Sequence, residues 1–113
     1  LPTATFTQPA PATITQPAPL TAPAPISPSG TLECSKVTGG TTLKWSAVSH
    51  PNGIDHYEWV LSGPTNESGS TGGTQASTST LSCNKANYQW RVRAVDGQGN
   101  IGPWSAYMLF NVP

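Results

Sequence analysis

The sequence predicts an all-β fold preceded by an extended segment rich in Pro, Thr and Ala. Residues 88–95 alternate strictly between the two faces of an extended strand. A Gly- and Asn-rich turn follows, and residues 106–112 then form a second strand candidate, while no long segment has the 3.6-residue period of a helix. Residues 1–30 contain eight Pro and no charge, a composition that cannot bury a core of its own.

The first thirty residues are built on an eight-residue repeat. Residues 5–12 (TFTQPAPA) and 13–20 (TITQPAPL) agree at six of eight positions, and residues 21–28 (TAPAPISP) are a degraded third copy. Two interpretations stay open for this segment. It is either a stiff spacer that offers Thr and Ser for O-glycosylation, or an extended strand that docks on another copy of the chain.

The docking hypothesis rests on the large apolar residues of this segment. Four of them occupy even positions, so an extended chain would place these four on one face. Polyproline geometry, with three residues per turn, aligns three of the four as well. Such a strand would join copies head to tail into a filament. The polar run 62–80 is the expected acceptor edge, and a cleft between the sheets is the alternative. The predicted docking residues are Phe6, Ile14, Leu20 and Ile26.

Short strands are predicted in order along the rest of the chain. The first three candidates are residues 31–37, 41–48 and 55–61, separated by Gly and by a turn at 50–53. Residues 62–80 are polar and are expected to contain the edge strand of the smaller sheet, because polar edges discourage aggregation. This run also holds the triplet Asn66-Glu67-Ser68, an N-glycosylation sequon that occurs often by chance.

The closing hairpin carries a family resemblance. The run YQWRVRAVD, the Gly/Asn turn and the GPWS that follows resemble the last two strands of a fibronectin type III domain, and the resemblance extends back to about residue 31. It implies a seven-stranded fibronectin type III or immunoglobulin-like sandwich over 31–113, with 1–30 as a linker or docking strand. Tyr88 matches the family's corner Tyr, whose hydroxyl bonds back to the chain. The other residues that the resemblance places inward are Leu32, Cys34, Val37, Leu43, Trp45, Tyr57, Trp59, Leu61 and Leu81.

The resemblance also places the two cysteines, Cys34 and Cys83, inward at one pole of the sandwich. It implies a disulfide that closes a loop of about 50 residues and stabilises the fold by roughly 4 kcal/mol. Two buried free thiols are the alternative. A disulfide would indicate an oxidising, extracytoplasmic compartment.

A Trp/Arg ladder is the best-defined polar constellation. Arg91 and Arg93 lie two apart on the outward face of one strand, and Trp104 follows on its neighbour, so guanidinium stacking on the indole is expected. Glu58 is the expected counter-charge. A structural role is favoured over a ligand site. Trp104 and Tyr107 are also the two aromatics left exposed for a carbohydrate-binding interpretation.

Charge and motif content exclude several classes of function. Five basic and five acidic residues balance to zero, which argues against nucleic acid and anionic membranes as partners. No apolar run approaches the length of a membrane span, and residues 1–7 do not resemble a signal peptide, so a mature or excised segment is expected. Asp55 and Asp96 share a predicted pole with Asn52 and Asn100, where calcium or acid–base chemistry competes with a simpler turn-forming role. No catalytic residue, metal ligand or cofactor is predicted.

These observations predict a non-catalytic extracellular module with a structural or adhesive role. We expect a glycosylated subunit of a bacterial cell-surface stalk or fibre, joined to copies of itself or to adjacent domains through residues 1–30. Glycans are a further class of partner. The alternative is a carbohydrate-binding or spacer module accessory to a secreted enzyme.

Overall fold

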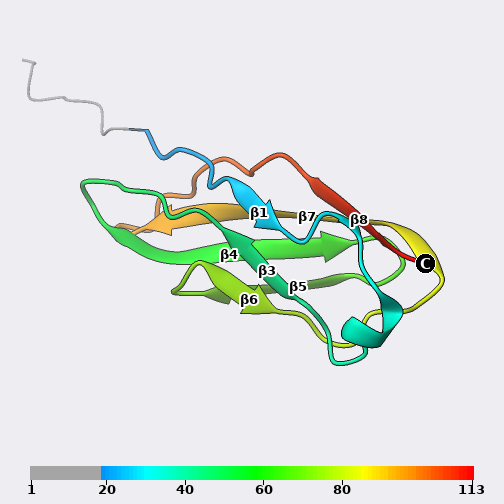
Figure 1. Ribbon diagram of the computed structural model, residues 1–113. Helices are drawn as coiled ribbons and strands as arrows, with labels where there is room; N and C mark the ends of the chain where they lie inside the picture. Colours follow the sequence, from blue (N-terminus) through cyan, green and yellow to red (C-terminus); the bar gives the residue numbers. More distant parts are fainter. Residues whose placement is uncertain (1–18) are drawn as a thin grey trace, which may run out of the picture.

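The computed structural model describes residues 19–113, which form two facing β-sheets (Figure 1). One sheet has three strands in the order β1-β3-β6, and the other has five in the order β2-β8-β7-β4-β5. The all-β prediction is confirmed, and the arrangement is sandwich-like. The strands are β1 (Pro25–Ser27), β2 (Gly30–Thr31), β3 (Thr42–Trp45), β4 (Ile54–Ser62), β5 (Glu67–Thr71), β6 (Gln75–Ser77), β7 (Lys85–Asp96) and β8 (Met108–Val112).

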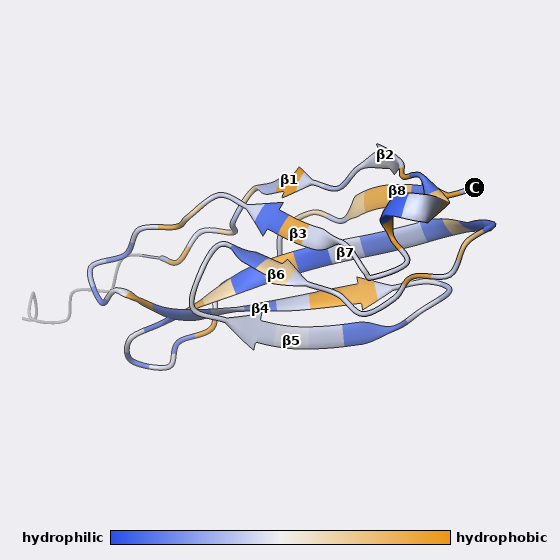
Figure 2. Cartoon of the chain, turned by 60° about the horizontal axis from the view of Figure 1, so that its bottom comes forward, coloured by the Kyte–Doolittle hydropathy of each residue, from blue (hydrophilic) through white to orange (hydrophobic). Residues whose placement is uncertain are grey.

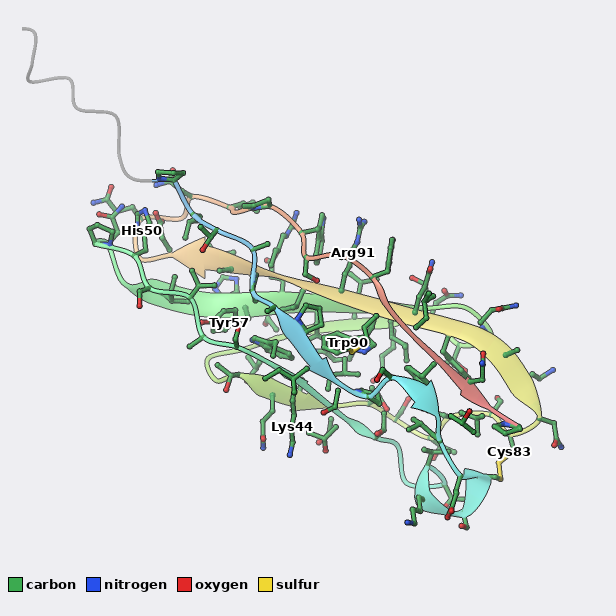
Figure 3. All side chains as sticks on the ribbon, turned by 45° about the horizontal axis from the view of Figure 1, so that its top comes forward. Lys44, His50, Tyr57, Cys83, Trp90 and Arg91 are labelled. Carbon is green, nitrogen blue, oxygen red and sulfur yellow. A yellow bond between two sulfur atoms is a disulfide. The ribbon has the colours of Figure 1, made fainter. Side chains whose placement is uncertain are left out.

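The core lies between the two sheets and follows the predicted alternation. Tyr57 and Trp90 point into this space, whereas Lys44 and Arg91 project from opposite outer faces (Figure 3). The indole rings of Trp45 and Trp90 are 6.2 Å apart. Burial of each such side chain stabilises the fold by on the order of 1.5–3 kcal/mol. The apolar strand residues of this core are Leu43, Trp45, Tyr57, Trp59, Leu61, Tyr88, Trp90, Val92, Ala94, Phe110 and Val112. Val95 is buried as well, although the alternation places it on the outer face.

The antiparallel pair β4–β7 is the centre of the larger sheet and sets its outer face. Trp59 pairs with Val92 in the core, and Glu58 pairs with Arg93 on the outside. Because side chains alternate along a strand, the register of this pair determines both which residues face the core and which face solvent.

The sandwich begins earlier than the expected boundary at residues 30/31. Strand β1 pairs with β3, and β2 pairs in parallel with β8, so residues 25–31 contact both sheets. A strand that contains Pro fits here because β1 is the edge strand of its sheet. At an edge, a residue without an N–H group can point its nitrogen to the unpaired side, and every hydrogen bond to the neighbouring strand can still form.

Core contacts also fix residues 20–28. The backbone amide and carbonyl of Ala24 both bond to Ser46, each at 2.9 Å. The buried indole Nε1 of Trp90 donates to the carbonyl of Pro28 at 3.2 Å. Leu20 packs against the core, and a Cβ added at Gly102 would lie 2.9 Å from the Leu20 Cβ. These residues therefore belong to the folded domain.

The predicted first strand, 31–37, is mostly replaced by a turn. Only Thr31 is in a strand, and Cys34–Lys36 form one turn of 3₁₀-helix. The inward residues Leu32, Cys34 and Val37 are spaced by two and then by three positions, which departs from the period of a strand. Val37 alone of these three is fully buried.

The polar run 62–80 forms one of the two edges of each sheet. It contains the expected strand of the smaller sheet, β6, and also β5 at the edge of the larger one. Figure 2 shows β5 without apolar residues. Residues 19–113 therefore contain eight strands where seven were expected. Leu81, expected on a strand, is buried in the connection to β7.

The disulfide between Cys34 and Cys83 is present and confirms that prediction. It lies at the pole that carries the C-terminus, whereas the described chain starts at the opposite pole, near His50 (Figures 1 and 3). Within residues 19–113, no helix has the length and apolar character that crossing a bilayer requires.

Candidate functional site

The outer face of the larger sheet carries a ladder of charged and aromatic side chains. The Arg93 guanidinium lies over the indole of Trp104 at 4.2 Å, and that of Arg91 lies over it at 4.7 Å. Residues two apart on a strand are about 7 Å apart, which is the spacing for a ring inserted between the two groups. Arg91 also lies 4.7 Å from the ring of Tyr107. The predicted stacking is therefore present, and Tyr107 extends it.

An ionic network continues the ladder across β4. Arg93 Nε donates to Glu58 at 2.7 Å, as the sequence suggested. His56 lies beyond, with its Nδ1 2.7 Å from Asp55 and its Nε2 3.3 Å from Glu58. The hydrogen bond to Asp55 raises the pKa of His56 above its ordinary value, and the hydrogen bond from Arg93 lowers the pKa of Glu58. Both shifts favour the charged forms.

A shallow depression of about 360 Å³ lies beside the ladder. Its walls come from β4 and β5, together with Arg93 and Trp104. The wall residues from the two strands are Glu58, Val60, Ser68, Gly69 and Ser70. Hydroxyl, carboxylate and guanidinium groups beside an indole could accept a small polar ligand such as a sugar.

The ladder limits how Trp104 could bind such a ligand. Sugars stack on the face of an aromatic ring, and guanidinium groups lie over the faces of this indole. Tyr107, with 41% of its surface exposed, keeps more of its ring accessible. The remaining Trp and Tyr residues of the described chain are buried, as the alternation predicted: Trp45, Tyr57, Trp59, Tyr88 and Trp90.

A second polar cluster lies at the opposite pole from the disulfide and surrounds the buried carboxylate of Asp96. Its Oδ1 accepts hydrogen bonds from the backbone amides of Gln98 and Asn100 at 2.9 and 2.8 Å. Its Oδ2 accepts from the side-chain amides of Asn52 and Asn100 at 3.1 and 3.0 Å. These bonds, those from Asn100 first, hold the pKa of Asp96 far below its ordinary value. The sequence correctly predicted that Asp96, Asn52 and Asn100 lie together.

The chemistry of this pole is that of a turn. Both carboxylate oxygens of Asp96 accept hydrogen bonds from N–H donors. Three of these bonds close the loop after β7, and the bond from Asn52 links it to the loop before β4. Asp55, expected nearby, pairs with His56 instead. Among residues 19–113, no group of three His, Cys, Asp or Glu is arranged to hold a metal ion.

The corner Tyr and the predicted docking residues complete the sites expected from the sequence. The Tyr88 hydroxyl accepts from the Ser82 amide at 2.9 Å and donates to the Ser82 carbonyl at 3.3 Å. Phe6 and Ile14 lie outside the described residues. Leu20 packs against its own domain and Ile26 is 59% exposed, so these two do not share one apolar face.

One exposed apolar residue escaped the sequence reasoning. Leu109 is 60% exposed on the outer face of the larger sheet, where it pairs with Gln89. Alternation along residues 106–112 carried the signal. Because Phe110 and Val112 point inward, Leu109 points outward with Tyr107.

The fold and these sites define a small, disulfide-linked domain of two facing β-sheets. No family model matches the chain, and no curated protein matches it. A solved structure titled "Myokine structure" has a TM-score of 0.58 and 14% identity, over 87% of this chain and 99% of the other. This similarity concerns the fold alone.

Proposed function

We propose that this chain is a fibronectin type III-like structural module of an extracellular assembly, joined to neighbouring copies through its Pro/Thr/Ala-rich N-terminal segment. The module is non-catalytic. Its titrating groups are engaged in structural bonds, because Asp96 closes a turn and Glu58 pairs with Arg93 and His56. The disulfide supports an oxidising compartment outside the cytoplasm.

The observation that carries the proposal is the docking of residues 20–31 on the sandwich. This Pro-rich stretch supplies strand β1 and a carbonyl for the Trp90 indole, and it packs Leu20 against the core. It therefore shows that a Pro/Thr/Ala sequence of this kind can pair with a sheet edge. Residues 5–12 and 13–20 are the two most similar copies of the octad. They have the same Pro/Thr/Ala composition, with Phe6 and Ile14 at the second position of each copy. On a neighbouring copy, such a contact does not close on itself, and it generates open chains.

Deletion of residues 1–18 tests this function. Sedimentation and negative-stain microscopy of the parent at rising concentration should show chains of increasing length, and the deletion variant should stay monomeric. The double substitution Phe6→Asp/Ile14→Asp keeps the length of the segment and should have the same effect. If the parent is monomeric, or if both variants assemble like the parent, the segment is a spacer and the proposal is wrong.

The second candidate is a carbohydrate-binding module, which the polar depression beside Trp104 favours. Its prediction differs sharply, since substitution of Trp104 would then remove affinity for a glycan. The stability and the glycan binding of Trp104→Ala, measured together, separate the two candidates.

A further inference from the structure

An acceptor for the N-terminal segment needs exposed apolar residues that can contact Phe6 and Ile14. The polar edge predicted from residues 62–80 has no large apolar side chain to receive Phe6 or Ile14. Part of it is also tied down, because the Glu67 carboxylate binds the amide and the hydroxyl of Ser79 at 3.1 and 2.8 Å. This edge offers backbone groups without an apolar surface.

The start of β8 offers both an apolar surface and an open strand edge. Tyr107 and Leu109 are 41% and 60% exposed and lie on the same outer face. Strand β2 pairs only with Phe110 and Asn111, so in the described chain β2 leaves Met108 and Leu109 without a strand neighbour on that side. We name Tyr107, Leu109 and the adjoining edge of β8 the Tyr107–Leu109 surface.

The chemistry of this surface fits a neutral Pro-rich strand. Such segments bind surfaces lined by aromatic rings, because the extended chain is stiff before it binds and little entropy is lost. The Tyr107 ring is backed by the Arg91 guanidinium at 4.7 Å, which holds it in place. Residues 1–18 contain no Lys, Arg, Asp or Glu, three large apolar residues (Leu1, Phe6 and Ile14) and several prolines.

Length and direction indicate that the strand comes from another copy. Eighteen residues in polyproline geometry span about 55 Å, which exceeds the roughly 40 Å of a twelve-residue strand such as β7. The described chain begins at the pole near His50, where Leu20 is held against Gly102 (Figure 3). β8 lies behind the point at which the described chain begins (Figure 1). A sharp reversal would be needed to reach the chain's own Tyr107.

We propose that the Tyr107–Leu109 surface receives residues 5–18 of a second copy. This inference rests on the proposed function and names its acceptor. Phe6 and Ile14 contact Tyr107 and Leu109, and the backbone of the incoming segment runs along the open edge of β8. Each copy donates from one pole and accepts on its β8 edge, so the assembly is open-ended.

Two full-length variants test the acceptor separately from the donor. Leu109→Asp places a charge on the surface and should weaken association by roughly 10- to 100-fold, as loss of one buried Leu implies. Tyr107→Ser is a second acceptor variant with the same expected effect. Ile101→Asp is the matched control, because Ile101 is 58% exposed outside the surface, and it should assemble like the parent.

Mixing gives the sharper outcome. The donor variant Phe6→Asp/Ile14→Asp retains its acceptor, and Leu109→Asp retains its donor, so an equimolar mixture should form one-to-one dimers that grow no further. Sedimentation velocity distinguishes these dimers from monomers and chains.

Each other outcome has a definite meaning. If the donor variant fails to assemble while both acceptor variants assemble like the parent, the acceptor is wrong and the proposed function stands. If the donor variant assembles like the parent, the proposed function fails first. A mixture that stays monomeric overturns the acceptor, as does a monomeric parent whose own segment contacts Leu109 in nuclear Overhauser spectra.

Discussion

Arg91 and Arg93 are two of the five basic residues of the chain, and both lie against Trp104. Stacking keeps the apolar parts of these long side chains on the sheet and leaves their charges near water. Arg93 has a carboxylate partner in Glu58, whereas Arg91 lies between two rings. The outer face is therefore stabilised by contacts between side chains that are partly buried.

Replacement of Trp104 by Ala should therefore destabilise the fold. We expect a loss of roughly 1–3 kcal/mol in the free energy of unfolding, from lost burial and two lost cation–π contacts. Chemical denaturation measures the effect. Trp104→Phe, which keeps an aromatic ring between the guanidinium groups, is the control and should lose less.

Glycan binding by the same variants distinguishes structure from recognition. A structural Trp104 predicts that neither the parent nor Trp104→Ala binds a panel of glycans. An alanine variant of unchanged stability that has lost affinity for a glycan would reverse the assignment in favour of a carbohydrate-binding module.

The edge strands form without the apolar alternation typical of strands, because a neighbouring strand provides their hydrogen-bond partners. β1 contains Pro, and β5 has no large apolar residue, yet β1 pairs with β3 and β5 pairs along the nine-residue strand β4. Edge positions tolerate this, since only one side of the strand needs a ladder. The elements in the centre, β4 and β7, show the alternation that edges lack.

Two truncations separate the folded part of the N-terminal segment from the rest. Removal of residues 1–18 should leave the free energy of unfolding unchanged in dilute solution. Removal of residues 1–30 should lower it by more than about 2 kcal/mol, because β1 is lost and the buried Trp90 indole loses its acceptor. Differential scanning calorimetry of both variants provides the measurement. Equal melting temperatures would mean that residues 19–30 do not belong to the domain.

The whole molecule is closed at each pole by a different device. The disulfide links the turn before β3 to the turn before β7 at one pole. At the other, Asp96 accepts three hydrogen bonds from the loop after β7 and one from Asn52 in the loop before β4. With five acidic residues in the chain, a single buried carboxylate has a large share in the acid response.

Stability should fall in acid because of Asp96. Its folded-state pKa is depressed below the ordinary value of 3.8, so the ionised form favours the folded state. This contribution is complete above about pH 4 and is lost as the pH falls towards the folded-state pKa. Asp96→Asn should be less stable at pH 7 and should lose less further stability between about pH 4 and 2. Glu33→Gln, at an exposed carboxylate, is the control for denaturation at each pH. A parallel pH profile for the parent and Asp96→Asn would contradict this role.

The sequence by itself determined the inner face of the sandwich and the contacts that follow from strand period. Tyr88, Trp90 and Val92 alternate with Gln89, Arg91 and Arg93, and this local pattern predicts both the core and the ladder. The turn at Asp96 follows from local chemistry in the same way, since Asx and Gly residues close tight turns.

Only the tertiary structure decided which strands lie at the edges and what covers them. Three features depend on neighbours far along the chain: the pairing of β1 with β3, the use of residues 62–80 for one edge of each sheet, and the exposure of Leu109 beside an open strand edge. The backbone groups of an edge strand bond to whichever strand lies beside them, and its side chains add little to that choice. Local sequence therefore predicts the centre of each sheet better than its borders.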